Sequence, residues 1–178
     1  MGINHVIQKR LLTSAKSFVP KDGWRPGETP LRMVGLILCL EDSSELDLIK
    51  RVKKLFTDQG AACHICIFRK DQKLVIPEEV IDDDTILLSS DSINWYGAVR
   101  PGCAEFLVHE SFDLMLNLSK EYFFSTSYLA ALTNATIKIG RYIHPHSSYR
   151  LVLGTNDHDN SDAFFELLER CLHFVRFE

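Results

Sequence analysis

The chain lacks the short motifs that identify most nucleotide-binding and hydrolytic enzymes. Its first long apolar run, MVGLILCL at 33–40, continues into EDSSE and not into the G-x-G-x-x-G of a dinucleotide-binding turn. Neither a P-loop nor a G-x-S-x-G nucleophile elbow occurs in the 178 residues. Because each motif supplies one backbone or nucleophile geometry, dinucleotide binding, P-loop hydrolysis and hydrolase chemistry lose their usual supports.

The chain also has no apolar run that approaches the roughly 20 residues needed to span a bilayer. Lys9 and Arg10 interrupt the N-terminal region, so we expect no signal peptide. The five cysteines are an odd number, and most stand inside apolar runs, as free buried thiols do. We therefore expect a reducing cytoplasm as the compartment.

Charge is modest and unevenly distributed. The net charge of -4 argues against nucleic-acid binding over the whole surface. Residues 1–32 hold six Lys or Arg and two Asp or Glu, a balance of +4, which leaves -8 on the rest of the chain. A basic leader on an acidic body indicates an interaction surface.

The basic leader repeats apolar residues at helical spacing, which predicts an amphipathic helix over residues 3–18. The apolar stripe consists of Ile3, Ile7, Leu11, Ala15 and Phe18, and the residues facing elsewhere include Gln8, Lys9, Thr13 and Lys16. One interpretation is a helix packed on the body of the domain. The other is a basic arm, with Lys9, Arg10 and Lys16 contacting RNA, an anionic lipid surface or an acidic protein. The Pro- and Gly-rich stretch at 20–30 predicts a linker, which divides the chain into 1–30 and an α/β domain at 31–178.

The rest of the chain alternates apolar strands with amphipathic helices. The predicted strands are 33–40, 62–68, 85–90, 112–118, 136–140 and 149–154. The predicted helices are 44–59, 104–108, 123–133 and a last one from about residue 160. In the first of them the inward stripe is expected to consist of Leu48, Ile49, Val52, Leu55 and Phe56, and Gly60 is expected to end the helix. Because β-α-β crossovers build parallel sheets covered by helices, we predict a single three-layer, Rossmann-like α/β domain. Its sheet is mostly parallel, with about five or six strands, and it carries an extra N-terminal helix.

Polar residues follow several of the predicted strands. In open α/β sheets, ligands bind beyond the carboxyl ends of the strands, which makes these residues candidates for ligand binding: Asp42, Ser43, Ser44, Ser119, Asn156 and Asp157. Turns and helix caps select the same residue types for local reasons. In particular, Ser43 or Ser44 is expected to cap the helix at 44–59.

No metal or cofactor site is predicted. Cys63 and Cys66 form a C-x-x-C match, but at three residues apart in a strand they point to opposite faces. His144 and His146 are the right spacing for half of a zinc site, and a proline-bearing loop explains them equally well. The acidic run at 82–84 lacks the alternating ligands and glycine of a calcium loop.

Two aromatic residues stand side by side in the turn sequence NWYG at 94–97. Trp95 is either an exposed platform for a ligand or an anchor in the core. We favour the anchor, because large aromatic side chains dominate burial energetics.

Four segments taken together resemble a known family. They are SINWYG (92–97), FDLMLNL (112–118), YLAALTNATIKIG (128–140) and the stretch from YRLVLG to FFELLERCLHFV. They are similar, over most of residues 32–178, to a family of short bacterial proteins of unknown function, which implies a small α/β sandwich and brings no catalytic residues. A weaker similarity, from DLMLNL to IKIG, is to the N-terminal, acceptor-side half of lipopolysaccharide-core glycosyltransferases. In those enzymes an acidic residue often stands at the position of Asn117.

Two hypotheses about function follow. The first is a non-enzymatic cytoplasmic accessory protein whose basic N-terminal helix contacts an acidic protein or RNA. The alternative is an enzyme or binder of a small phosphorylated or nucleotide-type ligand at the carboxyl ends of the strands, comparable to one half of a glycosyltransferase. A homodimer formed through the aromatic-rich C-terminal helix is compatible with both.

Overall fold

A computed structural model describes residues 3–15, 30–41, 43–71, 73–142, 148–154 and 160–175. In chain order the helices and strands are α1 (Ile3–Ala15), β1 (Met33–Leu40), α2 (Ser44–Thr57), β2 (Ala62–Arg69), β3 (Thr85–Leu88), α3 (Glu105–His109), β4 (Ser111–Asn117), α4 (Phe124–Leu132), β5 (Asn134–Gly140), β6 (Leu151–Val152) and α5 (Ser161–Val175). Short 3-10 turns occupy Glu78–Val80 and Ser90–Ser92. Among these helices, none has the length and apolar content that crossing a bilayer takes.

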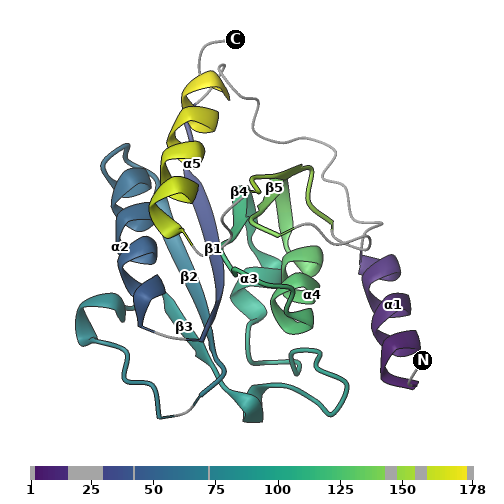
Figure 1. The fold of residues 1–178 in the computed structure, drawn as a ribbon. Helices are drawn as coiled ribbons and strands as arrows, with labels where there is room; N and C mark the ends of the chain where they lie inside the picture. Colours follow the sequence, from purple (N-terminus) through teal and green to yellow (C-terminus); the bar gives the residue numbers. More distant parts are fainter. Residues whose placement is uncertain are drawn as a thin grey trace.

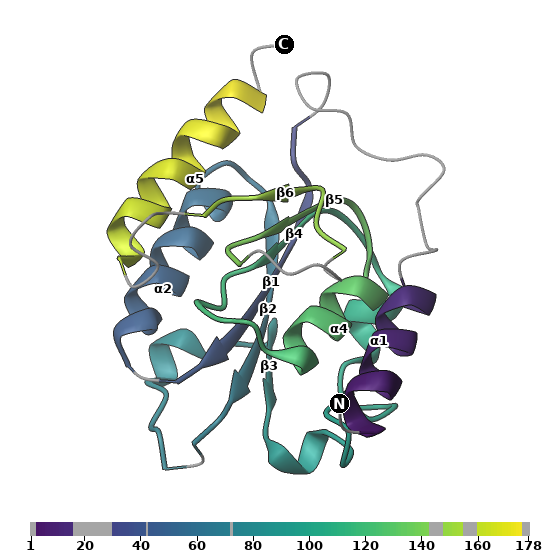
Figure 2. The same ribbon diagram turned by 45° about the vertical axis from the view of Figure 1, so that its right-hand side comes forward.

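The six strands form one open, entirely parallel sheet in the order β3-β2-β1-β4-β5-β6 (Figures 1 and 2). The predicted fold class is therefore confirmed. Strand order reverses between β1 and β4, where Val34 lies beside Leu114 and Ile37 beside Asn117. Because β1 has a neighbour on both sides and helices on both faces, its sequence is continuously apolar.

Alternate residues of β1 feed two separate cores. Leu36 and Leu38 face α2 and α5, whereas Ile37 and Cys39 face α3 and α4, and all four are at most 3% exposed. Figures 1 and 2 show the same division, with α2 and α5 on one side of the sheet and α3 and α4 on the other. The period of two in side-chain direction thus makes a three-layer domain from one apolar strand.

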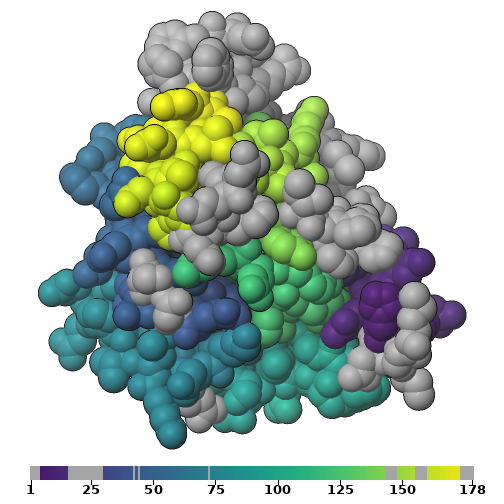
Figure 3. Space-filling model, viewed as in Figure 1, coloured from purple at the N-terminus to yellow at the C-terminus, as the bar shows by residue number. Residues whose placement is uncertain are grey.

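Helix α1 adds an outer layer next to α4 (Figure 2). Leu12 and Ala15 of α1 pack with Phe124 and Ala131 of α4 in a third apolar cluster. In Figure 3, α1 (purple) lies at the outer surface of the molecule, beside α4. The first interpretation of the N-terminal segment, a helix packed on the domain, therefore describes α1, whereas the division at residue 30 stays a prediction.

The last predicted strand, 149–154, is shorter in the structure. Only Leu151 and Val152 pair with β5, and the side chain of Tyr149, two residues before β6, lies against Gly140. A Cβ atom placed on Gly140 would lie 2.3 Å from the Tyr149 ring, so the glycine allows the ring to cover the end of β5. The predicted strand 85–90 also ends early, at Leu88, and a 3-10 turn follows at Ser90–Ser92.

Helix α2 shows which local predictions were right. Its predicted inward residues Leu48, Ile49 and Val52 are at most 1% exposed, and Gly60 follows the helix with a φ of 82°, as expected of a C-terminal glycine. Capping by the side chain of Ser43 was wrong. Ser43 has helical angles, φ -72° and ψ -14°, and makes no capping hydrogen bond, because an N-cap side chain needs an extended backbone to reach the helix N–H groups.

Candidate functional site

The carboxyl edge of β1 and β4 is the place where open α/β sheets usually bind ligands. The chain leaves β1 toward α2 on one face and leaves β4 toward α4 on the other. The loops therefore diverge at this edge, and ligands of open α/β sheets bind in the resulting crevice. Two predicted site residues lie here, Ser43 after β1 and Ser119 after β4.

Ser119 is buried and holds backbone together. Its hydroxyl accepts a hydrogen bond from the Cys39 N–H at 2.9 Å, and its own N–H donates to Oδ1 of Asn117 at 3.1 Å. Nδ2 of Asn117 donates to the Tyr149 hydroxyl at 2.5 Å, and burial raises the pKa of that phenol. These bonds connect the ends of β1 and β4 to the segment before β6.

Thr126, in the first turn of α4, closes this polar network. Its hydroxyl donates to the Phe123 carbonyl oxygen at 3.1 Å and lies 3.3 Å from both Asn117 Nδ2 and Ser119 Oγ. Ser119, Asn117 and Thr126 are 3%, 5% and 1% exposed. The polar atoms at the end of β4 are therefore used within the fold, where they orient α4.

A buried charged cluster lies at the same edge. Glu45 of α2 is 1% exposed, with one carboxylate oxygen 3.7 Å from Arg141 Nη1 and 3.9 Å from Lys120 Nζ. The Arg141 guanidinium is 2% exposed and lies over the Phe164 ring of α5 at 4.9 Å. The cluster thus joins residues from the ends of β4 and β5 with the first turn of α2 and with α5.

The hollow at this edge is small. It measures about 50 Å³ and is lined by Cys39, Glu41, Glu45, Lys70, Ser119, Lys120, Glu121, Tyr122 and Phe123. The Lys70 ammonium donates to Glu41 at 2.6 Å, and this hydrogen bond raises the Lys70 pKa. Sites for drug-sized ligands are usually about 300–1,000 Å³, so the hollow is too small for a nucleotide.

The six predicted ligand-binding residues have different outcomes. Asp42, Asn156 and Asp157 lie outside the described residues, as does the side chain of Ser44. Ser43 is exposed, and Ser119 is committed to the polar network. Sequence reasoning missed Glu45, Arg141 and Tyr149, because their burial depends on contacts between distant segments that no local pattern reveals.

Three of the five cysteines, Cys39, Cys63 and Cys66, are buried free thiols. Cys63 belongs to the core under α2 and Cys66 to the core under α3 and α4, as their spacing in β2 predicted. Burial is the largest cause that raises the pKa values of Cys39, Cys63 and Cys66 to about 12, so these thiols stay protonated and weakly nucleophilic. Within the described part of the chain, no group of three His, Cys, Asp or Glu residues is arranged to hold a metal ion. His144 and His146 lie outside it.

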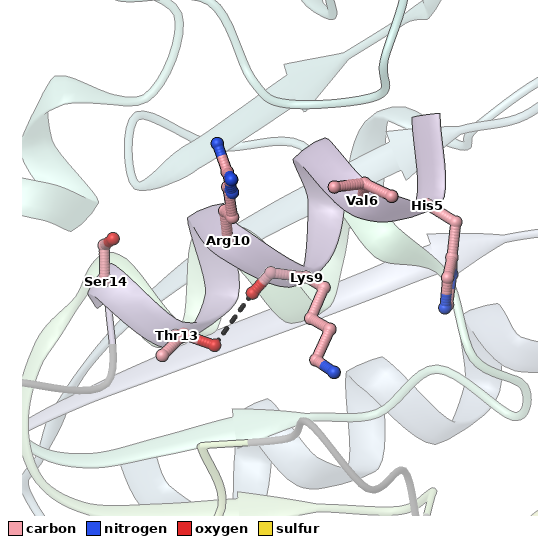
Figure 4. A pocket seen from close by; sticks show the side chains of 6 residues that line it. All are labelled: His5, Val6, Lys9, Arg10, Thr13 and Ser14. Atoms are coloured by element: carbon pink, nitrogen blue, oxygen red, sulfur yellow. Dashed lines mark hydrogen bonds between the residues drawn. The ribbon is translucent and has the colours of Figure 1, made fainter. Parts of the chain in front are cut away.

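The second candidate surface is the outward face of α1 (Figure 4). Its residues line a hollow of about 550 Å³ and are His5, Val6, Lys9, Arg10, Thr13 and Ser14. All six are exposed, and Val6 retains 48% of its accessible surface. The predicted partner-binding residues Lys9 and Arg10 are both on this face, and Lys16 lies outside the described residues.

The inward face of α1 is fixed to the domain. Leu12 is 1% exposed in the cluster with α4. Gln8, expected to face away, instead donates from Nε2 to the Tyr96 carbonyl oxygen at 2.8 Å. An apolar stripe and one partly buried hydrogen bond therefore set which side of α1 faces outward.

Trp95 lies in the turn that α1 contacts through Tyr96. The turn is closed by the Gly97 N–H, which donates to the Asn94 carbonyl oxygen at 2.9 Å. Trp95 is 70% exposed, so the anchor hypothesis was wrong for this residue. Tyr96, edge-to-face with Trp95 at 5.2 Å, packs instead against the cluster between α1 and α4.

Comparison with known proteins identifies the family and no activity. A family of unknown function (DUF6913) matches residues 4–174, so the expected resemblance is confirmed and extends over α1. No curated protein and no solved structure matches, and nothing found supports the glycosyltransferase likeness. Because the match runs from α1 to α5, the chain belongs to this family of unknown function.

Proposed function

We propose that this protein is a non-catalytic binding protein whose α1 contacts an acidic protein partner. The observation that carries the proposal is the two-sided use of α1. One side packs on α4, and the other exposes Lys9 and Arg10 together with the apolar Val6. A helix already held in place loses little conformational entropy when a partner binds its outer side.

Charge and apolar surface together favour a protein as the partner. Lys9 and Arg10 supply positive charge, and the +4 balance of residues 1–32 extends it. The body of the chain carries -8, which repels nucleic acid and anionic membranes at long range. Exposed Val6 and Trp95 suit an acidic segment that also carries apolar side chains, since aromatic and arginine residues are enriched in protein interfaces.

The strand order favours a second candidate function, the binding of a small phosphorylated ligand at the carboxyl edge of β1 and β4. We place it second because the hollow there is about 50 Å³. Its lining also includes the carboxylates of Glu41, Glu45 and Glu121, which oppose an anionic ligand. A thermal-shift screen with nucleotides and sugar nucleotides tests it, since a ligand at 100 times its Kd adds about 2.7 kcal/mol of stability.

The first proposal is tested by affinity capture from the native cell, with wild type compared to a Lys9→Glu, Arg10→Glu variant. Lys54→Glu, Lys73→Glu serves as the control, because both residues are exposed and the change in net charge is the same. We expect protein partners that wild type and the control retain and that the α1 variant loses. High salt should also release these partners, because the screening length between exposed charges falls from about 8 Å at physiological ionic strength to about 3 Å at 1 M salt.

Three results would contradict the proposal. The first is capture that the α1 variant retains at wild-type level. The second is loss of partners in the control variant as well, which would indicate a general charge effect. The third is capture abolished by ribonuclease, which would identify RNA as the partner.

A further inference from the structure

A hollow separate from both surfaces lies between α3 and α4. It measures about 240 Å³ and is lined by Val99, Arg100, Pro101, Gly102, Ala104, Glu105, Val108, His109, Tyr128, Leu129 and Leu132. None of these residues belongs to the outward face of α1 or to the carboxyl-edge hollow. The space is slightly below the range usual for drug-sized ligands and suits a molecule of about ten non-hydrogen atoms.

The part of this hollow formed by buried residues, which we call its floor, is apolar. Leu129 and Ala104 are 2% and 4% exposed, and Val108 and Leu132 are half-buried around them. Tyr128 lies beside them, stacked on Phe124 at 5.6 Å. An apolar group that binds here is removed from water, which stabilises the bound state by about 25 cal/mol per Å² of buried apolar surface.

The rim carries one fixed cation. The Arg100 N–H donates to the Ser92 carbonyl oxygen at 2.9 Å, and Arg100 Nε donates to the Ile93 carbonyl oxygen at 3.0 Å. The following turn is set by Gly102, whose φ of 89° favours glycine. With Nε occupied, the two Nη groups of Arg100 remain as donors, and a guanidinium can bind a carboxylate through two parallel bonds.

The rim also carries one anion, Glu105, the first residue of α3. Both Arg100 and Glu105 are exposed, and within the described residues neither forms an ion pair. The hollow therefore offers an apolar floor, a positive group and a negative group to one small molecule.

We propose that this hollow binds a free apolar α-amino acid. The aliphatic or aromatic side chain lies on Leu129 and Leu132, the carboxylate pairs with Arg100, and the ammonium group pairs with Glu105. A neutral apolar ligand would pair with neither Arg100 nor Glu105. A simple carboxylate would pair with Arg100, but its negative charge would be repelled by Glu105. An apolar amino acid matches all three features, because its side chain contacts the apolar residues and its two charged groups pair with Arg100 and Glu105.

Isothermal titration of the full chain with L-leucine and L-phenylalanine tests the proposal. We expect Kd values of about 0.1–5 mM, given the limits on affinity per ligand atom. Three analogues of leucine each remove one feature: glycine lacks the apolar group, 4-methylpentanoate the ammonium group, and 3-methylbutylamine the carboxylate. Each should bind at least about tenfold more weakly than leucine, because a charged hydrogen bond or a buried aliphatic group is worth at least that factor.

Variants give an independent readout. Arg100→Met should weaken leucine binding about tenfold and Glu105→Gln about threefold, whereas Arg150→Met, at an exposed arginine elsewhere, should bind as wild type does. No heat from either amino acid at 10 mM, glycine binding equal to leucine, or unchanged affinity in Arg100→Met would each overturn the proposal. The analogue series uses the wild-type protein, so it decides the matter even where Arg100→Met does not fold. It is also independent of the outcome for α1.

Discussion

The carboxyl edge of the sheet and the outward face of α1 use charged residues in opposite ways. At the edge, Glu45 and Arg141 are almost completely buried and contact each other. On α1, Lys9 and Arg10 are exposed. The difference teaches that a place where a fold usually binds ligands can be occupied by the polar groups of the protein itself. We therefore propose binding at surfaces whose side chains make few contacts within the fold, such as the outward face of α1.

The largest expected effect is on the buried cluster. Arg141→Met leaves the Glu45 carboxylate buried with a lost partner, and such a loss costs about 3–5 kcal/mol of unfolding free energy. Urea denaturation measures it. In the double variant Glu45→Gln, Arg141→Met the loss should be clearly smaller than the sum of the two single losses. A loss below about 1 kcal/mol in Arg141→Met would show that the edge does not depend on this pair.

A second test concerns the packing at the end of β5. Gly140→Ala places a Cβ atom 2.3 Å from the Tyr149 ring, and overpacking of this kind costs about 1–3 kcal/mol. Gly154→Ala is the matched control, since nothing lies within 4 Å of the added atom, and thermal denaturation compares the two. Equal melting temperatures would mean that Tyr149 does not close the edge.

Two predicted site residues sharpen the comparison within the edge itself. Ser119→Ala removes the acceptor of the buried Cys39 N–H and should cost about 1–2 kcal/mol. Ser43→Ala removes an exposed hydroxyl without a capping bond and should stay within about 0.5 kcal/mol. If Ser43→Ala proves the more destabilising in urea, the exposed Ser43 hydroxyl supports the fold more than the buried Ser119 hydroxyl does.

The buried Lys138 and the exposed Lys9 should differ in how they make the stability of the protein depend on pH. Lys138 is 8% exposed, its ammonium donates to the Ala131 carbonyl oxygen, and burial lowers its pKa from 10.5 to about 8. Between those pH values the unfolded chain holds the proton that the folded chain has released, so stability rises with pH. Between pH 8 and 9, wild type should gain about 1 kcal/mol relative to Lys138→Met. The exposed control, wild type against Lys9→Met, should show a constant difference over the same range.

The smallest expected effect is on the outward face of α1. Lys9→Met, Arg10→Met keeps good helix formers at both positions and should change the unfolding free energy by less than about 0.5 kcal/mol. The same variant should lose the proposed acidic partner. A destabilisation above about 1 kcal/mol would indicate that these cations support the fold and would weaken the distinction between the two regions.

Much of the fold could be predicted from local pattern. The run at 33–40 matches β1, and the stripe of Leu48, Ile49 and Val52 matches the buried side of α2. These predictions succeed because burial on two faces, or on one helical stripe, leaves a direct trace in neighbouring residues.

The candidate site was less accessible to sequence reasoning. Ser119 was chosen as a free polar residue and is instead a buried acceptor. Trp95 was assigned to the core and is exposed, because its neighbour Tyr96 fills the space beside α1. Adjacent residues in a turn point in different directions, and composition does not decide which one is buried.

The sequence by itself determined the apolar strands, the amphipathic helices and therefore a parallel α/β sheet, since these follow from hydrophobic periodicity over a few turns or strand residues. Only the tertiary structure decided the strand order, the meeting of Glu45 with Arg141 and the outward side of α1. The pairing of β1 with β4, the Glu45–Arg141 contact and the packing of α1 each join residues 80 or more positions apart, as when Gln8 reaches Tyr96 or Cys39 reaches Ser119. Contacts over such distances arise from the packing of whole elements, and no local sequence window contains both partners.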